Sequence, residues 1–181
     1  MQPLPTELAG LVRLAPTVHR DERGFFSETF RAEEWAAHGV DVSFVQDNHS
    51  RSRRGTLRGM HFQTRPGQAK LIRCARGAVL DVVVDIRRSS PTFGRWEAWR
   101  LDEEEMHQLF VPVGFAHGFC VLSEEADVLY RCSSYYDPAT EHGFAYDDPT
   151  VGIEWPRELE LTVSARDRAA PALREHGDEL P

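Results

Sequence analysis

Cysteine is scarce in this sequence and long apolar runs are missing, and each absence excludes a class of protein. The three cysteines among 181 residues, Cys74, Cys120 and Cys132, are an odd number without C-x-x-C spacing. This usage excludes a disulfide mini-protein and indicates the reduced, mostly buried thiols of a cytoplasmic protein. No apolar run approaches the ~20 residues of a membrane span, and the N-terminus lacks the pattern of a secretory signal. We therefore expect no association with membranes.

Acidic residues are missing from one long segment of an otherwise acidic chain. The formal net charge of −8 argues against a general nucleic-acid binder. No acidic residue lies between Asp47 and Asp81, whereas that segment holds Arg51, Arg53, Arg54, Arg58, Arg65, Lys70, Arg73 and Arg76. A basic segment in an acidic protein suits a local anionic ligand such as a phosphate, or forms a solvated arginine face. Charge alone leaves both interpretations open.

Lysine is almost absent, because Lys70 is the only one and all other basic residues are arginines. A single lysine in such a chain points to a position that needs a compact ammonium group. Chance explains one such residue equally well, so this observation only directs attention to Lys70.

The length and composition fit one domain with its own core. The hydrophobic fraction is 41% and the charged fraction 28%, close to the average of globular proteins and unlike a disordered chain. We expect a single domain over residues 1–181. An arm over residues 1–20 leads into it, and a tail over residues 172–181 frays at its end.

Short apolar segments bounded by turn residues predict β-strands throughout the middle of the chain. They are FVQDN, TLRGMHFQ, KLIRCA, AVLDVVVDIR, GRWEAWRL, HQLFVPVG, AHGFCVL and ADVLYRCSSYY. Within residues 79–86 the side chains alternate, with Leu80, Val82, Val84 and Ile86 on one face and Val79, Asp81, Val83 and Asp85 on the other. Many short strands without alternating helices predict an all-β sandwich or jelly roll.

Two short segments outside the strands have helical patterns. RAEEWAAHG, which ends at Gly39, predicts a helix with a glycine cap. LTVSARDRAAP, with Ser164 in a capping position, predicts a short helical or irregular segment. Both are too short to change the all-β prediction.

The segment PVGFAHGF, residues 112–119, has the form P-x-G-x-x-H-x-F and resembles the second motif of the cupin superfamily. This resemblance implies a double-stranded β-helix jelly roll in which His117 points into the barrel. Many cupins bind a metal through an additional H-x-H motif, but here Gln63 follows His61 at that spacing. Lys70 then stands where a glutamate ligand is expected, and a cation opposes metal binding. We therefore predict a cupin pocket without a metal.

A closer resemblance rests on motifs that follow one another from about Val18 to Pro171. They are RGFFSE (23–28), FVQDNHS (44–50), LRGMHFQ (57–63), GQAKL (67–71), DIR (85–87), SPTFG (90–94), GFAHGF (114–119), LY (129–130), GIEWP (152–156) and SARD (164–167). In this order they resemble the dTDP-4-dehydrorhamnose 3,5-epimerase family. The resemblance implies an isomerase that acts on a dTDP-4-keto-6-deoxyhexose without a cofactor.

The resemblance also implies the catalytic roles. His61 matches the base, and an imidazole suits proton abstraction because its ordinary pKa lies near neutral pH. Asp167 matches its acidic partner, which stabilises the imidazolium. Tyr130 matches the acid that returns a proton on the opposite face, because a phenol keeps its proton at neutral pH. Lys70 matches the cation beside the C4 oxyanion.

The remaining matched positions imply substrate contacts of several chemical kinds. Arginines suit the diphosphate, aromatic rings suit the pyrimidine, and carboxylates or amides suit hydroxyl and base edges. The residues are Arg23, Arg58 and Arg166; Phe26 and Tyr136; and Glu28, Glu141, Gln46 and Asn48, with His117 lining the sugar pocket. At position 166 the family is associated with lysine, and arginine keeps the charge but changes its geometry.

Family membership leaves several functional alternatives open. The full catalytic set favours inversion at both C3 and C5, giving dTDP-4-keto-L-rhamnose, but relatives that invert only one centre share the same substrate class. A metal-dependent cupin and a non-catalytic sugar-binding jelly roll are alternatives from other classes. Members of the family are typically homodimers with crossing N-terminal strands, so we expect Arg23 and Glu28 to complete the partner's site.

Overall fold

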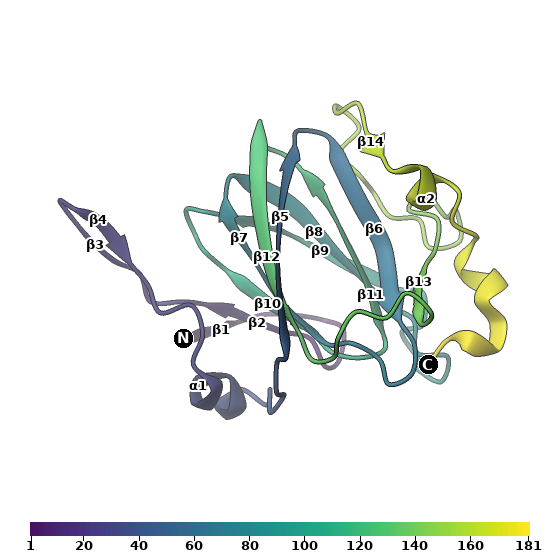
Figure 1. The fold of residues 1–181 in the computed structure, drawn as a ribbon, viewed down its shortest axis with the longest axis horizontal. Coiled ribbons are helices and arrows are strands. Elements are labelled where there is room, and N and C mark those ends of the chain that lie inside the picture. The colour runs from purple at the N-terminus through teal and green to yellow at the C-terminus, as the bar shows by residue number, and fades with distance from the viewer.

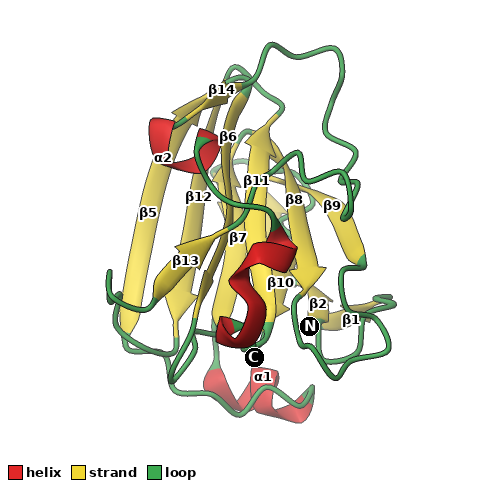
Figure 2. Cartoon of the chain, turned by 90° about the vertical axis from the view of Figure 1, so that its right-hand side faces the viewer, coloured by secondary structure: helices red, strands yellow, loops and turns green.

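The computed structural model describes residues 1–181 as two facing antiparallel sheets with short helices at their edges (Figures 1 and 2). The first sheet has the order β1 (Gln2–Leu4), β2 (Val12–Ala15), β10 (Gln108–Val111), β7 (Lys70–Arg76), β12 (Glu125–Cys132) and β5 (Gln46–Arg53). The second has the order β13 (Glu141–Gly143), β6 (Thr56–Gln63), β11 (Phe115–Val121), β8 (Ala78–Asp85) and β9 (Trp96–Asp102). The short β14 (Thr162–Val163) pairs with β6 in parallel.

Every strand segment read from the sequence is a strand, from β5 to β12, so the jelly-roll prediction is confirmed. The alternation in β8 also has its expected consequence. Val79 and Val83 join a core cluster between the sheets, whereas Val82 and Val84 join a second cluster on the outer face. Both faces of this strand are therefore buried, and the inner face is the one that carries Asp81.

The outer faces of the two sheets are covered by different parts of the chain. Helix α1 (Ala32–Ala37) places Trp35 against the first sheet, and it ends before Gly39 as the sequence predicts. Residues 144–181, including α2 (Ala165–Arg168) and the 3-10 helix η1 (Leu173–Glu179), cover the second. Leu173 is 1% exposed in this cluster, so the tail over residues 172–181 packs against the second sheet.

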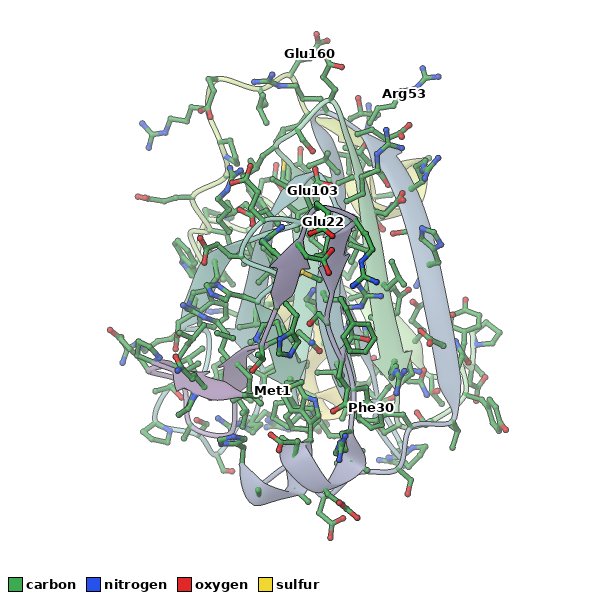
Figure 3. The ribbon with its side chains drawn as sticks, turned by 90° about the vertical axis from the view of Figure 1, so that its left-hand side faces the viewer. Met1, Glu22, Phe30, Arg53, Glu103 and Glu160 are labelled. Atoms are coloured by element: carbon green, nitrogen blue, oxygen red, sulfur yellow. The ribbon has the colours of Figure 1, made fainter.

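The N-terminal region divides into a part within the sheet and a projecting part. Strands β1 and β2 pair with each other, and β2 pairs with β10. The hairpin of β3 (His19–Asp21) and β4 (Gly24–Phe26) stands away from the body in Figure 1, and Glu22 marks its tip in Figure 3. Phe26 on this hairpin is 70% exposed. The projecting arm is therefore residues 19–26, while β1 and β2 belong to the sheet.

The DIR and SPTFG motifs build a loop around one buried carboxylate. Asp85 accepts hydrogen bonds from Arg87 Nη2 at 2.7 Å, Ser90 Oγ at 2.6 Å and Thr92 Oγ1 at 2.6 Å. Burial raises the pKa of Asp85, but these donors outweigh it and lower the pKa to about 2. These residues hold the turn that follows β8 and lie outside the cavity described below.

No helix of this structure has the length and apolar character needed to cross a bilayer.

Candidate active site

A cavity of about 490 Å³ lies between the two sheets, with β5, β7 and β12 on one wall and β6, β11 and β13 on the other. Helix α2 and the end of β14 close part of its rim. It brings together eight of the residues proposed from the sequence: Arg58, His61, Lys70, His117, Tyr130, Glu141, Arg166 and Asp167. The cavity is also lined by polar residues that were not proposed as site residues from the sequence: Ser50, Thr56, Thr162 and Ser164.

His61 and Asp167 are in contact although they are far apart in the sequence. His61 Nε2 lies 2.7 Å from Asp167 Oδ1. A carboxylate only accepts, so Nε2 carries the hydrogen and Nδ1 is the ring nitrogen left to take a proton. Burial raises the pKa of Asp167, but His61, the Gly59 amide and Ser164 outweigh it and hold the pKa below its ordinary value. Asp167 is therefore an anion that fixes the ring and its tautomer.

The position of Asp167 depends on local backbone structure at two places. Ser164 caps α2 as the sequence predicts, because its side chain accepts from the Asp167 amide at 3.0 Å. On β6, the Gly59 amide donates to Asp167 Oδ2 at 3.3 Å. A Cβ at Gly59 would lie 2.6 Å from Gly118 Cα, so only glycine allows β6 and β11 to approach here.

His117 forms a second histidine–aspartate pair on the same wall. It faces His61 across β6 and β11, and its Nε2 lies 2.9 Å from Asp81 Oδ2. Asp81 is fully buried, and its Oδ1 has no hydrogen-bond partner. Asp81 was not predicted as a site residue, although a carboxylate on the same strand face as Val79 and Val83 is a signal for a buried polar pair.

Tyr130 and Lys70 lie on the opposite wall. Burial raises the pKa of the Tyr130 phenol, against a smaller opposing effect of the Asn48 amide, so the phenol is protonated at neutral pH. Burial lowers the pKa of Lys70, and Cys132, Glu141 and Asp81 oppose that effect. Lys70 Nζ lies 5.9 Å from the centre of the Tyr130 ring. This wall therefore places a protonated phenol beside the amino group of Lys70.

Two arginines line the cavity, and a carboxylate pairs with one of them. Arg166 Nη1 donates to Glu141 Oε2 at 2.6 Å, and its side chain is half exposed. Arg58 Nε donates to Ser52 Oγ at 3.0 Å, which leaves its terminal nitrogens without a carboxylate partner. Both guanidinium groups therefore offer the cavity donors of the kind that bind phosphate oxygens.

Gln46, Asn48 and Tyr136 form a neighbouring cluster that does not line the cavity. Gln46 Nε2 donates to Asn48 Oδ1 at 3.1 Å, and Gln46 Oε1 accepts from the Tyr136 amide at 2.9 Å. Asn48 is opposite Tyr130 in the register of β5 and β12. These three residues therefore lie beside the Tyr130 wall and extend the site along the edge of the first sheet.

Arg23, Phe26 and Glu28 lie away from the cavity of their own chain. Arg23 pairs with Asp21 within the hairpin, and Glu28 pairs with Arg31. The structure thus divides the proposed substrate contacts into residues within the chain's own cavity and residues on or beside a projecting hairpin.

The cavity's donor set does not fit a metal ion. The Nε2 atoms of His61 and His117 each bind an aspartate, and the Gln63 amide donates to the Tyr135 carbonyl at 3.2 Å. Lys70 places an ammonium group where a carboxylate ligand would be needed. The groups are arranged instead for proton transfer near an anion.

Fold and cavity together define a cupin-type jelly-roll protein with acid–base residues on both walls. Residues 5–175 match the model of the dTDP-4-dehydrorhamnose 3,5-epimerase family. The chain is 46% identical to the dTDP-4-dehydrorhamnose 3,5-epimerase of Methanothermobacter thermautotrophicus, with 96% of this chain and 95% of the relative covered. This protein belongs to the dTDP-4-dehydrorhamnose 3,5-epimerase family, as its motifs predict.

Solved structures agree with this assignment. The 3,5-epimerase of Legionella pneumophila in complex with dTDP-4-keto-L-rhamnose superimposes with a TM-score of 0.97 at 43% identity, covering 99% of this chain and 97% of the other. The 3′-monoepimerase ChmJ of Streptomyces bikiniensis in complex with dTDP-quinovose gives a TM-score of 0.91 at 44% identity, covering 100% and 92%. The same fold therefore serves both double and single epimerisation.

Proposed function

We propose that this protein inverts C3 and C5 of dTDP-4-keto-6-deoxy-D-glucose and releases dTDP-4-keto-L-rhamnose. One observation carries the proposal: a base and an acid face the same cavity from opposite walls. His61, bound to Asp167, lies on β6 of one sheet, and Tyr130 lies on β12 of the other. Inversion of a carbon centre requires removal of a proton from one face and its return on the other.

The proton transfers follow from the chemistry of the ketone. The C4 carbonyl acidifies the protons on C3 and C5, so His61 Nδ1 takes one of them while the electrons of the C–H bond move to the C4 oxygen. Asp167 stabilises the imidazolium that results. Lys70 stabilises the enolate oxygen. The electrons on the C4 oxygen then return to the carbon, which takes the Tyr130 proton on its opposite face while the ketone re-forms. Exchange with solvent removes the proton from His61 and reprotonates Tyr130, and the two steps repeat at the second centre.

His117 and Asp81 position the sugar between these groups. The imidazole ring of His117 is held by the Asp81 carboxylate and lies beside His61 in the cavity wall. Arg58 and Arg166 bind the diphosphate, and Glu141 accepts from a sugar hydroxyl or the base. Gln46, Asn48 and Tyr136 contact the nucleoside along the edge of the first sheet. This arrangement extends from the reacting carbons to the pyrimidine.

We further propose a homodimer in which the β3–β4 hairpin of one chain completes the site of its partner. The hairpin projects from the body, and its Phe25 and Phe26 are mostly exposed. A stacked aromatic ring needs a partner surface, and a pyrimidine in a neighbouring site provides one. Arg23 and Glu28 would then contact the nucleotide of the partner. Native mass spectrometry that detects only monomer would contradict this assembly.

The cysteines, the packing of the termini and the net charge bear on the compartment, the domain organisation and the partners of the protein. The three cysteines are free and buried, as expected for a protein of the reducing cytoplasm. We propose that residues 1–181 form one domain, because the tail and both N-terminal strands join the same pair of sheets. The net charge of −8 argues against nucleic acid as a partner, and the expected partners are the nucleotide sugar and a second copy of the chain.

Single epimerisation is the second candidate function, because the chain also resembles the monoepimerase ChmJ. The test is incubation of the purified protein with dTDP-4-keto-6-deoxy-D-glucose, followed by proton NMR of the sugar ring. Ring coupling constants of the L-rhamno product support double inversion. A product altered at one centre assigns a monoepimerase, and saturable binding without conversion would contradict any epimerase activity.

A further inference from the structure

Three metal-binding side chains converge on the outer side of the second sheet, away from the catalytic cavity. They are His142 on β13 and His176 and Glu179 on η1, and one donor atom of each lies within 4.8 Å of the others. Glu179 Oε2 is 3.8 Å from His142 Nδ1 and 3.8 Å from His176 Nδ1. None of the three lines the cavity that holds His61.

His176 is already oriented as metal-ligating histidines are. Its Nε2 lies 3.0 Å from the Gly143 carbonyl oxygen. A carbonyl only accepts, so in the neutral ring Nε2 carries the hydrogen and Nδ1 holds the lone pair. Ligating histidines usually donate their second ring nitrogen to a carbonyl or carboxylate in this way, which fixes both tautomer and orientation. The His176 side chain is also almost fully buried, so its ring is held in place.

The aromatic side chain of Phe62 packs against both imidazole rings. The Phe62 ring stacks on His142 with centroids 5.6 Å apart and meets His176 edge-on at 5.2 Å. His142 is opposite Phe62 in the register of β13 and β6, whereas its neighbours Glu141 and Gly143 are opposite Gln63 and His61. Because side chains alternate along a strand, His142 points to the outer face. The sheet thus separates this cluster from the reacting groups.

We propose that His142, His176 and Glu179 bind a zinc ion that fastens the C-terminal helix η1 to β13. Two imidazoles and one carboxylate are a ligand set that zinc accepts, with a water molecule in the fourth position. Zinc–ligand distances of about 2.0–2.2 Å place tetrahedral donors about 3.4 Å apart. The observed 3.8 Å separations approach this value. A small rotation of the Glu179 side chain, which is 62% exposed, brings its carboxylate closer to both histidines. The donor atoms of His142 and His176 lie within 4.8 Å of each other, so a rotation of the half-buried His142 ring must bring them together as well.

The ion would reach the site from solvent. Glu179 also lines an open cleft of about 310 Å³ between residues 63–67 and the last four residues of the chain. Binding would join the end of the tail to the strand that carries Glu141 on its other face. The proposed role is structural, and it holds whether or not the epimerase assignment is correct.

Zinc titration of chelator-stripped protein without a histidine tag tests the proposal. Isothermal calorimetry is expected to give one zinc ion per chain, and zinc is expected to raise the melting temperature. His142→Ala and Glu179→Gln are expected to weaken binding at least tenfold and to abolish that rise. Asp178→Asn is the matched control for the second variant, because Asp178 is the adjacent exposed carboxylate and pairs with Arg88.

A second control tests whether any histidine–carboxylate pair binds zinc equally well. His107 lies 3.7 Å from Glu105, but this pair has no third metal-binding side chain beside it. His107→Ala is therefore expected to leave the zinc affinity unchanged. X-ray absorption of the zinc-loaded wild type is expected to show two imidazole ligands, a readout that does not depend on the folding of any variant. Absence of stoichiometric zinc binding, or equal affinity in His142→Ala, would overturn the proposal.

Discussion

Asp167→Asn is the substitution that most closely probes the His61–Asp167 pair. Asp167 accepts from His61 Nε2 through Oδ1 and from the Gly59 amide through Oδ2. Asparagine has only one acceptor oxygen for these two donors. If that oxygen faces Gly59, its amide group faces His61 and forces the opposite tautomer, with hydrogen on Nδ1. If the oxygen faces His61, two N–H groups oppose each other at Gly59.

The size of the effect follows from the interactions that are lost. A hydrogen bond between the imidazolium and a carboxylate is worth about 1.5–3 kcal/mol, which corresponds to about 10- to 150-fold in rate. The wrong tautomer adds to this loss, because the proton-accepting nitrogen is then occupied. In the serine protease triad, an Asp→Asn change of the aspartate that orients the catalytic histidine lowers kcat about 10⁴-fold. We therefore expect kcat to fall between about 10² and 10⁴-fold here.

Steady-state conversion of dTDP-4-keto-6-deoxy-D-glucose, followed by NMR, measures this effect. The KM is expected to change little, because Arg58 and the other diphosphate contacts are intact. Asp148→Asn is the control, because Asp148 is another buried aspartate that accepts from the Leu173 amide outside the cavity. It is expected to lower stability without lowering kcat. An Asp167→Asn enzyme whose kcat lies within threefold of wild type would refute this role.

Three further changes have distinct expected outcomes. Tyr130→Phe removes the phenolic proton but leaves the base, so deuterium should still exchange in D₂O while inversion falls; equal loss of both would contradict its role. Lys70→Met should lower kcat about 10²- to 10³-fold with little change in dTDP affinity, as measured by calorimetry. The lowered pKa of Asp85, about 2 against 3.8, stabilises the fold by about 2 kcal/mol above pH 4, and this is lost as pH falls towards 2. Asp85→Asn should remove that pH dependence in urea unfolding, and an unchanged profile would show that the Arg87 network contributes nothing.

The strands were predicted well because each one is a short apolar segment bounded by turn residues, a pattern that lies within the segment itself. The segment TLRGMHFQ has the same first and last residues as β6. Val82 and Val83 lie in different core clusters, on opposite faces of β8, as the alternation of side chains requires. The packing of the tail was not predicted, because its polar residues indicate exposure. Leu173 and Leu180 are too widely spaced for a periodic pattern, and only the outer face of the second sheet explains their burial.

The candidate site was predicted mainly through motifs, because its contacts join distant parts of the chain. His61 and Asp167 are 106 residues apart, and nothing in either segment alone states that they meet. Asp81 was missed because its partner, His117, lies on the neighbouring strand β11, and the register between β8 and β11 is not encoded in either segment alone. The position of Arg23 and Phe26 on a projecting hairpin also depends on tertiary structure, which local sequence does not encode.

In the proposed mechanism, His61 removes and Tyr130 returns a proton at both C3 and C5, each from its own wall of one cavity. The most direct measurement is NMR of dTDP-4-keto-6-deoxy-D-glucose with the wild-type protein in D₂O containing a chelator. Deuterium is expected at both C3 and C5, together with formation of dTDP-4-keto-L-rhamnose. Deuterium at one centre only would contradict double inversion, and none at either centre, with folded protein, would contradict the proton-transfer account itself.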